Sequence, residues 1–340
     1  MIPRERVRQA LSRKEADRVP YCELGVDRAL AEQIMGWGSG QNEKSNLEAN
    51  AYTVEESKRI AQRLGLDNIT FALRAPVYAD KRPGKQGRLF YGDGQIKTEK
   101  DIERIQLPDP HDPAFYQEAE RFVKNKGDYS AWLVTRIGIF PTMLSLGLEN
   151  FSIALYDNRR FVETVMDLYF DWARVMADHV CQMGFDVFVT TDDLAFKTQP
   201  FFSPKIFREM VVPRYKRVVE KITIPWFIHS DGNIEPILKD FLSLGICGVH
   251  PNEKGAMDIR QIKRKYGHRV CLLGNVDLNL LGAGTPEEVD EEVRGLIRDV
   301  APGGGYIVTS GNSLAGYLQR ENVLALSEAV KKYGRYPIAL

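Results

Sequence analysis

Apolar runs alternate with amphipathic segments along most of the chain. Short apolar runs predict buried strands, whereas apolar residues that recur every three or four positions predict helices. The predicted strands cover residues 19–24, 66–71, 132–135, 186–191, 224–228, 246–250, 269–273 and 305–309. The predicted helices cover residues 3–12, 28–36, 53–65, 113–127, 159–183, 203–222, 234–244, 257–266, 285–301 and 321–334, with another after the turn at 138–141.

This order of elements predicts an α/β fold with a parallel sheet. Strands such as 269–273 are apolar at successive positions, which is typical of strands that helices cover on both faces. Eight such units favour one (β/α)8 TIM-barrel domain over residues 1–340. The rival is an open doubly wound sheet, but no Gly-x-Gly-x-x-Gly follows the first strand. Gly and Pro breaks with alternating apolar positions in residues 74–100 predict an inserted N-terminal β-hairpin.

The longest predicted helix, residues 159–183, has an almost continuous apolar face. His179 lies on that face, so we expect it in the core rather than in a functional site.

Composition excludes several classes of function. The 340 residues are 44% hydrophobic and 27% charged, with a formal net charge of zero, so no overall field attracts nucleic acid or an anionic membrane. There is no run of eighteen apolar residues to span a bilayer, and the first residues predict a charged helix rather than a signal peptide. The four cysteines form no Cys-x-x-Cys pair, which indicates buried thiols in a reducing cytoplasm and argues against a thiolate metal site.

A histidine and two carboxylates follow neighbouring strands near the middle of the chain. His229 and Asp231 project to the same side because side chains alternate along a strand, and Glu253 ends the next apolar run. Imidazole and carboxylate groups at adjacent strand ends can hold a divalent metal. The alternative is that His229 makes a structural hydrogen bond to Asp231 or to the turn.

Further polar residues fall at predicted strand ends, where barrel enzymes have their active sites. For most of them the alternative is that turns simply require polar residues. Of the neighbours Asp192 and Asp193, alternation allows only one to face the site. The set is Glu23, Asp67, Arg136, Asp192, Asp193, His229, Asp231, Glu253, Asn275, Asp277, Ser310 and Asn312.

Several short motifs resemble the uroporphyrinogen decarboxylase superfamily in their order and spacing, most clearly in residues 184–336. The resemblance implies a (β/α)8 barrel and a homodimer. The motifs are Asp17-Arg18-Val19-Pro20, Gly184-Phe185-Asp186, Phe202-Ser203-Pro204, Ile228-His229, Gly232-Asn233, Leu273-Gly274-Asn275-Val276-Asp277, Thr285-Pro286-Glu287-Glu288 and Gly304-Gly305-Tyr306-Ile307.

One branch of the superfamily decarboxylates porphyrinogens, and its members resemble one another in an arginine-rich N-terminal loop. Here Tyr21–Val26 contains no arginine pair, and Glu23 has the wrong sign for a substrate with eight carboxylates. Asn312 replaces the late histidine of that branch. These departures argue against decarboxylation.

The other branch contains corrinoid-linked methyltransferases that use zinc. Carrying over its zinc pattern matches His229 to the histidine and Glu253 to the glutamate, while Asp231 and Asn312 fall where cysteines are expected. Oxygen in place of sulfur makes a bound metal a stronger Lewis acid, suited to polarising an ether oxygen. The resemblance therefore implies metal ligation by His229, Asp231 and Glu253. Asp193 or Asp192 is a further candidate, either as another ligand or as the group that orients a substrate hydroxyl, and Asp193 is the one counted among the catalytic residues.

The predicted activity is transfer of a methyl group from a methyl ether, foremost an aryl ether, to the cob(I)alamin of a separate corrinoid protein. A partner is required because the chain lacks the Asp-x-His-x-x-Gly corrinoid motif. The expected substrate-binding residues are Glu23, Asp192, Arg136, Phe196 and Asn312, and the aromatic residues that could cup a ring are Tyr21, Phe196, Phe201, Phe202 and Tyr317.

The sequence also leaves three other functions open. The first is methyl transfer from methylcobamide to a thiol or to tetrahydrofolate, and the second is uroporphyrinogen decarboxylation. The third is a catalytically silent barrel that binds a tetrapyrrole or a corrinoid protein without a metal.

Overall fold

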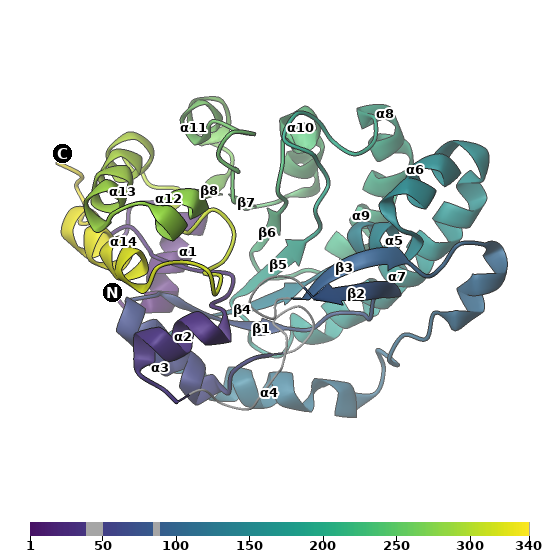
Figure 1. The fold of residues 1–340 in the computed structure, drawn as a ribbon, viewed down its shortest axis with the longest axis horizontal. Helices are drawn as coiled ribbons and strands as arrows, with labels where there is room; N and C mark the ends of the chain where they lie inside the picture. Colours follow the sequence, from purple (N-terminus) through teal and green to yellow (C-terminus); the bar gives the residue numbers. More distant parts are fainter. Residues whose placement is uncertain (39–49, 84–88, 340) are drawn as a thin grey trace.

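Seven parallel strands form a sheet that curls into a barrel in the computed structural model, which describes residues 1–38, 50–83 and 89–339 (Figure 1). Their order is β1-β4-β5-β6-β7-β8-β9, so each strand pairs with the next one along the barrel. The strands are β1 (Asn68–Ala72), β4 (Ser130–Thr135), β5 (Val187–Thr191), β6 (Trp226–His229), β7 (Gly248–His250), β8 (Cys271–Leu273) and β9 (Tyr306–Ile307).

The segment around Tyr21 closes the barrel between β9 and β1. Tyr21 forms a parallel bridge with Val308, and Cys22 N donates to Val308 O at 3.0 Å. On the other side, Asp67 N donates to Tyr21 O at 2.7 Å. This closure confirms the predicted (β/α)8 barrel, although residues 19–24 pair through bridges rather than as a regular strand.

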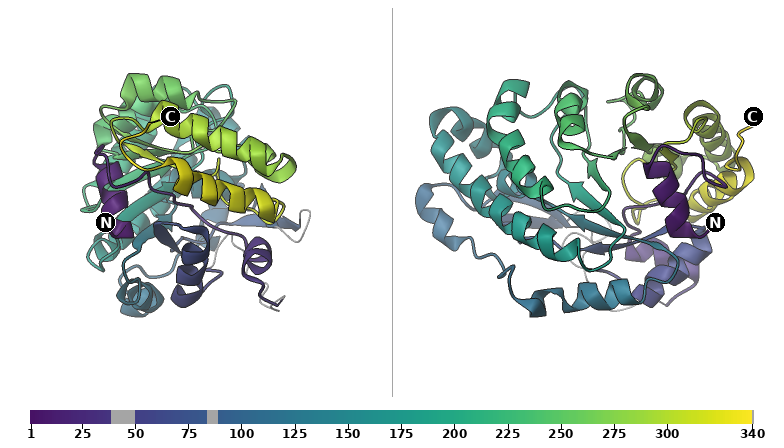
Figure 2. Two further views of the ribbon diagram at one scale, coloured as in Figure 1. Left: turned by 90° about the vertical axis from the view of Figure 1, so that its left-hand side faces the viewer. Right: turned by 180° about the vertical axis from the view of Figure 1, so that it is seen from behind.

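Helices cover the outside of the sheet, and α13 and α14 run side by side (Figure 2). No helix among residues 1–38, 50–83 and 89–339 is long and apolar enough to cross a membrane. The helices are α1 (Pro3–Leu11), α2 (Arg28–Met35), α3 (Val54–Leu64), α4 (Gln117–Lys124), α5 (Ile139–Leu146), α6 (Leu148–Asp157), α7 (Arg159–Val180), α8 (Pro204–Ile206), α9 (Val212–Val219), α10 (Glu235–Leu244), α11 (Ile259–Tyr266), α12 (Leu278–Ala283), α13 (Pro286–Val300) and α14 (Arg320–Tyr333).

Irregular turns explain where the predicted helices differ from the observed ones. The predicted helix 113–127 begins as the 3-10 helix η3 (Pro113–Tyr116), and a π-helical turn, η4 (Phe207–Val211), lies within predicted helix 203–222. The short helices α6 and α12 were not predicted.

Two apolar clusters lie on the two faces of the sheet. Trp132 and Val134 point into the barrel with Phe227 and Leu273, whereas Ala131 and Leu133 pack outward against the helices. Helix α1 adds its own apolar side chains to the inner cluster. These two layers explain why the strands are apolar at successive positions.

The predicted hairpin is present as antiparallel strands β2 (Ala79–Pro83) and β3 (Leu89–Gly94), which pack on α5. At Gly94 a Cβ atom would lie 2.1 Å from Gly147 N, so the backbones meet at a distance that only glycine permits.

Two smaller predictions are wrong. His179 is exposed at the last turn of α7, where its ring centroid lies 5.1 Å from that of Tyr116 and 6.2 Å from that of His111, rather than in the core. Asp67 precedes β1, so it lies at the amino end of that strand and not at the mouth formed by the carboxyl ends. There it accepts hydrogen bonds from Arg6, Arg18 and Tyr21 N.

Candidate metal centre at the barrel mouth

Three predicted site residues meet at the carboxyl ends of β5 and β6. His229 Nε2 lies 3.7 Å from Asp193 Oδ1 and 3.9 Å from Asp231 Oδ1. One potential ligand atom from each residue lies within 4.8 Å of the other two. Among the described residues, buried Asp231 Oδ1 has no hydrogen-bond partner. One nitrogen and two carboxylate oxygens around a common point fit a divalent cation.

Two loops hold these carboxylates together. Asp231 N donates to Asp193 Oδ1 at 3.0 Å, and Asn233 N donates to Phe196 O at 2.8 Å. Gly232 has φ +80°, and a Cβ atom there would lie only 2.3 Å from Ala195 O. The close approach of the loops therefore depends on glycine at position 232.

The electrostatics of the cluster also favour a cation. Burial, together with the negative charges of Asp193 and Glu253, raises the pKa of Asp231 to about 8, although the hydrogen bond from Asn312 opposes this shift. Burial lowers the pKa of His229, although Asp193 opposes that shift. A divalent cation would bind neutral imidazole and relieve the repulsion between the carboxylates.

A second histidine supports the first. His229 Nδ1 lies 2.6 Å from His250 Nδ1, and both side chains are buried. The two residues are direct partners in the β6–β7 register. When His229 donates its Nδ1 proton to His250, its Nε2 lone pair faces the two carboxylates, as metal ligation requires.

Glu253 lies beside the cluster, in contact with its loop. Its Oε2 accepts a hydrogen bond from Gly232 N at 2.7 Å, and its Oε1 lies 3.7 Å from Lys197 Nζ. Glu253 was predicted as the third metal ligand, but the group whose ligand atoms lie within 4.8 Å of one another contains Asp193 in its place. Asn312 is also brought to the site, since its Nδ2 donates to Asp231 Oδ2 at 2.8 Å.

Asp192 points into the surrounding wall. It is fully buried and accepts hydrogen bonds from Tyr215 Oη at 2.9 Å and from Ile137 N and Phe140 N, both at 3.3 Å. Burial raises its pKa to about 6. Of the two neighbouring aspartates, Asp193 is therefore the one that reaches His229.

Glu23 lies on the seam that closes the barrel. Ser310 donates to it through its backbone N at 2.9 Å and its Oγ at 2.6 Å, and burial raises the pKa of Glu23 to about 8. Arg136 follows β4 directly and donates from Nη1 to Tyr91 Oη at 3.1 Å.

The predicted aromatic cup is only partly available at the surface. Phe196 is 53% exposed and packs edge-on against Phe201, with ring centroids 4.4 Å apart. Tyr317 is exposed as well, whereas Tyr21 and Phe202 are buried in the core.

His250 was not among the predicted site residues. It lies at the end of a predicted strand, as the other candidates do, but its pairing with His229 depends on the register between two strands.

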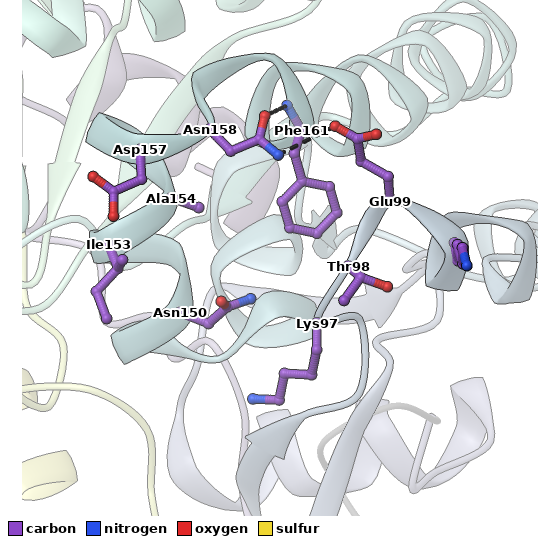
Figure 3. Close-up of a pocket in the computed structure, with 10 residues that line it drawn as sticks. Lys97, Thr98, Glu99, Asn150, Ile153, Ala154, Asp157, Asn158 and Phe161 are labelled. Atoms are coloured by element: carbon purple, nitrogen blue, oxygen red, sulfur yellow. Dashed lines mark hydrogen bonds between the residues drawn. The ribbon is translucent and has the colours of Figure 1, made fainter.

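A separate hollow of about 600 Å³ lies between the 3-10 helix η2 (Glu99–Arg104), α6 and the start of α7 (Figure 3). Asn158 spans it, donating to Glu99 Oε1 and accepting from Phe161 N. None of the residues of the metal cluster lines this hollow.

A closed barrel with titratable groups gathered at its carboxyl end has the arrangement that is typical of (β/α)8-barrel enzymes. The uroporphyrinogen decarboxylase (URO-D) family model matches residues 86–333, and the chain belongs to that family.

Curated relatives carry the same family name. The uroporphyrinogen decarboxylase of Chlorobium phaeovibrioides is 26% identical over 254 residues, which is 70% of each chain. That of Alkalilimnicola ehrlichii is 24% identical over 261 residues, covering 73% of this chain and 69% of the relative.

Solved structures show the same fold. A methyltransferase from Methanosarcina mazei superposes with a TM-score of 0.76 at 18% identity, covering 98% of this chain and 99% of the other. A B12-independent methionine synthase from Shewanella sp. W3-18-1 gives a TM-score of 0.50 at 11% identity, covering 82% and 86%. At these identities the likeness establishes the fold alone.

Proposed function

We propose that this chain is the methyltransferase component of a corrinoid-dependent system. It would transfer a methyl group from a methyl ether, foremost an aryl ether, to the cob(I)alamin of a separate corrinoid protein. The methyl carbon–oxygen bond breaks, the oxygen leaves as phenolate or alkoxide, and a carbon–cobalt bond forms. The observation that carries the proposal is the cluster of Asp193, His229 and Asp231 at the barrel mouth.

Two further observations support methyl transfer over decarboxylation. The fold matches the methyltransferase from Methanosarcina mazei over nearly the whole length of both chains. Glu23 occupies a position where a polycarboxylate substrate would need a cation, and it is buried against Ser310. The names of the curated relatives favour decarboxylation as the second candidate.

Zinc is the expected metal, with His229 Nε2, Asp193 and Asp231 as the residues that would hold it and Glu253 as a neighbouring carboxylate. When bound, it would supply Lewis acidity at the ether oxygen. The protein's own groups prepare the site. Burial lowers the pKa of His229, which favours the neutral imidazole. Asn312 orients Asp231 by donating to its Oδ2, while Oδ1 of Asp231 has no partner among the described residues.

An anaerobic assay tests the proposal. Zinc-loaded protein is mixed with cob(I)alamin and methoxybenzenes that differ in their substituents, and loss of the cob(I)alamin absorption is followed together with phenol formation. The wild type should form methylcobalamin and phenol in equal amounts, and His229→Ala should not. His179→Ala makes the same change at an exposed histidine outside the site and should retain the wild-type rate.

Decarboxylation is measured in parallel as release of carbon dioxide from uroporphyrinogen. Release that is unaffected by His229→Ala, without any methyl transfer, would assign the chain to the second candidate. Methyl transfer to a thiol or to tetrahydrofolate is read from the same mixtures by offering methylcobalamin with each acceptor. No turnover in any mixture would favour the silent scaffold.

A further inference from the structure

Arg136 carries a buried positive charge at the carboxyl end of β4. The residue is 7% exposed and follows β4, whose last residue, Thr135, accepts a hydrogen bond from Thr191 Oγ1 of β5 at 2.9 Å. Asp192, the residue before Asp193, accepts hydrogen bonds from the backbone on the carboxyl side of Arg136. The guanidinium therefore belongs to the same edge of the barrel as the predicted metal ligands.

Aromatic rings flank this guanidinium. Its Cζ lies 5.2 Å from the ring centroid of Tyr91 and 5.4 Å from that of Phe140. Nη1 donates to Tyr91 Oη, while Nε is buried without a partner among the described residues. Rings of this kind stabilise a cation but do not neutralise it.

The charge lacks an anionic partner within the part of the chain that the structure describes. Buried Arg6, by contrast, is ion-paired with Asp17 and Asp67. Asp192 interacts electrostatically with Arg136, but its oxygens already accept hydrogen bonds from Tyr215 and from the backbone. A guanidinium removed from water is costly unless an anion with matching geometry meets it.

The location of Arg136 indicates that the anion that pairs with it could belong to the substrate. Arg136 follows the last residue of β4, β4 pairs with β5, and Thr191 of β5 pairs with His229 of β6, so Arg136 and the predicted metal ligands lie at the same end of the sheet. A planar guanidinium binds a carboxylate through parallel hydrogen bonds.

We infer that Arg136 is the subsite for a carboxylate carried by the substrate, so that the methyl donor is an acidic methyl ether of the methoxybenzoate type. This inference rests on the proposed function for the ether, while the carboxylate contact is independent of methyl transfer. The carboxylate neutralises the buried guanidinium and orients the ether toward the side where Asp193, His229 and Asp231 meet.

Equilibrium binding tests the inference without turnover. Isothermal titration calorimetry compares 3-methoxybenzoate with the neutral 3-methoxybenzamide, using metal-free and zinc-loaded protein. The wild type should bind the acid about 10- to 100-fold more tightly than the amide, as expected of a charge-assisted bidentate contact. Arg136→Gln should abolish this preference and leave the affinity for the amide unchanged.

Two further variants separate charge from structure. Arg136→Lys keeps the charge without the planar fork and should retain only part of the preference. Arg160→Gln removes an exposed arginine outside the site and should retain all of it. Circular dichroism and thermal unfolding establish that each variant is folded before it is titrated.

Equal binding of acid and amide by the wild type would overturn the inference, as would a preference that survives in folded Arg136→Gln. If inorganic phosphate binds as tightly as the acid and displaces it, Arg136 binds free anions and the inference also fails. A preference for the acid without any methyl transfer would leave the carboxylate subsite standing and refute the proposed function. Methyl transfer from neutral ethers, without any preference for binding the acid, would support the proposed function and refute the carboxylate subsite.

Discussion

The rings of His229 and His250 meet through their Nδ1 atoms, 2.6 Å apart, on adjacent strands β6 and β7. Only one proton can lie between two neutral imidazoles, so this contact couples the tautomers of the two side chains. With the proton on His229, its Nε2 is free to bind a metal between Asp193 and Asp231. We therefore interpret His250 as a positioning residue for the metal centre.

Substitution of His250 tests that role. His250→Leu removes the acceptor, so zinc affinity should fall about 10- to 100-fold, as expected for loss of an outer-shell partner. His250→Asn restores an acceptor near the former Nδ1 and should recover part of the affinity. Competition with a chromogenic chelator measures both constants, and equal affinity of wild type and His250→Leu would refute the positioning role.

The position of Asp193 predicts that it ranks above Glu253 as a ligand. Asp193→Asn removes a charged oxygen 3.7 Å from His229 Nε2 and should abolish stoichiometric zinc binding. Glu253→Gln should keep about one zinc per chain, because Glu253 chiefly accepts a hydrogen bond from Gly232 N. Metal analysis after gel filtration decides the order, and the opposite ranking would restore Glu253 as the third ligand.

Glu23 predicts a pH-dependent stability. Burial raises the pKa of its carboxyl group from 4.5 to about 8, so between these values the folded chain holds a proton that the unfolded chain has released. Its contribution is complete below pH 4.5 and is lost as the pH rises through about 8. Relative to Glu23→Gln, the wild type should lose about 1.4 kcal/mol of unfolding free energy per pH unit between about pH 5.5 and about pH 7.

Urea unfolding at several pH values measures this difference. Glutamine has nearly the same shape and can still accept the bond from Ser310 N, so the variant is expected to fold. Parallel pH dependences for the two proteins would contradict the assignment of a protonated Glu23.

The ion pair at the opposite end of the barrel predicts a large loss of stability. Arg6 pairs with Asp67, whose buried carboxylate also accepts from Arg18 and from Tyr21 N. Arg6→Met should lower the unfolding free energy by about 3 kcal/mol because it leaves part of a buried charge unpaired. Arg8→Met, at an exposed position of the same helix, should change it by less than about 0.5 kcal/mol. Equal effects in urea unfolding would argue against this pairing.

Periodicity was sufficient to predict the barrel and most of its helices. Trp132 and Leu133 illustrate why: neighbouring residues of one strand are buried in different apolar layers, which a covered parallel sheet requires. The pattern did not mark the end of α7 as exposed, because an apolar period does not reveal where the covering layer ends. His179 was assigned to the core for that reason.

The site was harder to predict because it depends on register and turn geometry. The alternation of side chains along a strand predicted that only one of Asp192 and Asp193 faces the site. The contact with Tyr215 shows that Asp192 is the one that points away from it. His250 meets His229 through the pairing of β6 with β7, a tertiary relationship. Glu253 follows Asn252, whose backbone is in the left-handed region with φ +59°. The spacing of Glu253 from Asp231 in the sequence therefore did not determine its place beside the cluster.

His229, Asp193 and Asp231 are proposed to bind a catalytic metal, and the metal content of purified protein decides whether they do. Protein purified without chelator and reconstituted with zinc is gel-filtered and analysed by plasma mass spectrometry, for the wild type, His229→Ala and the His179→Ala control. We predict about one zinc per chain in the wild type and the control, and its loss in His229→Ala. A wild type that retains no metal after reconstitution, or a folded His229→Ala that retains it fully, would show that these residues do not form a metal site.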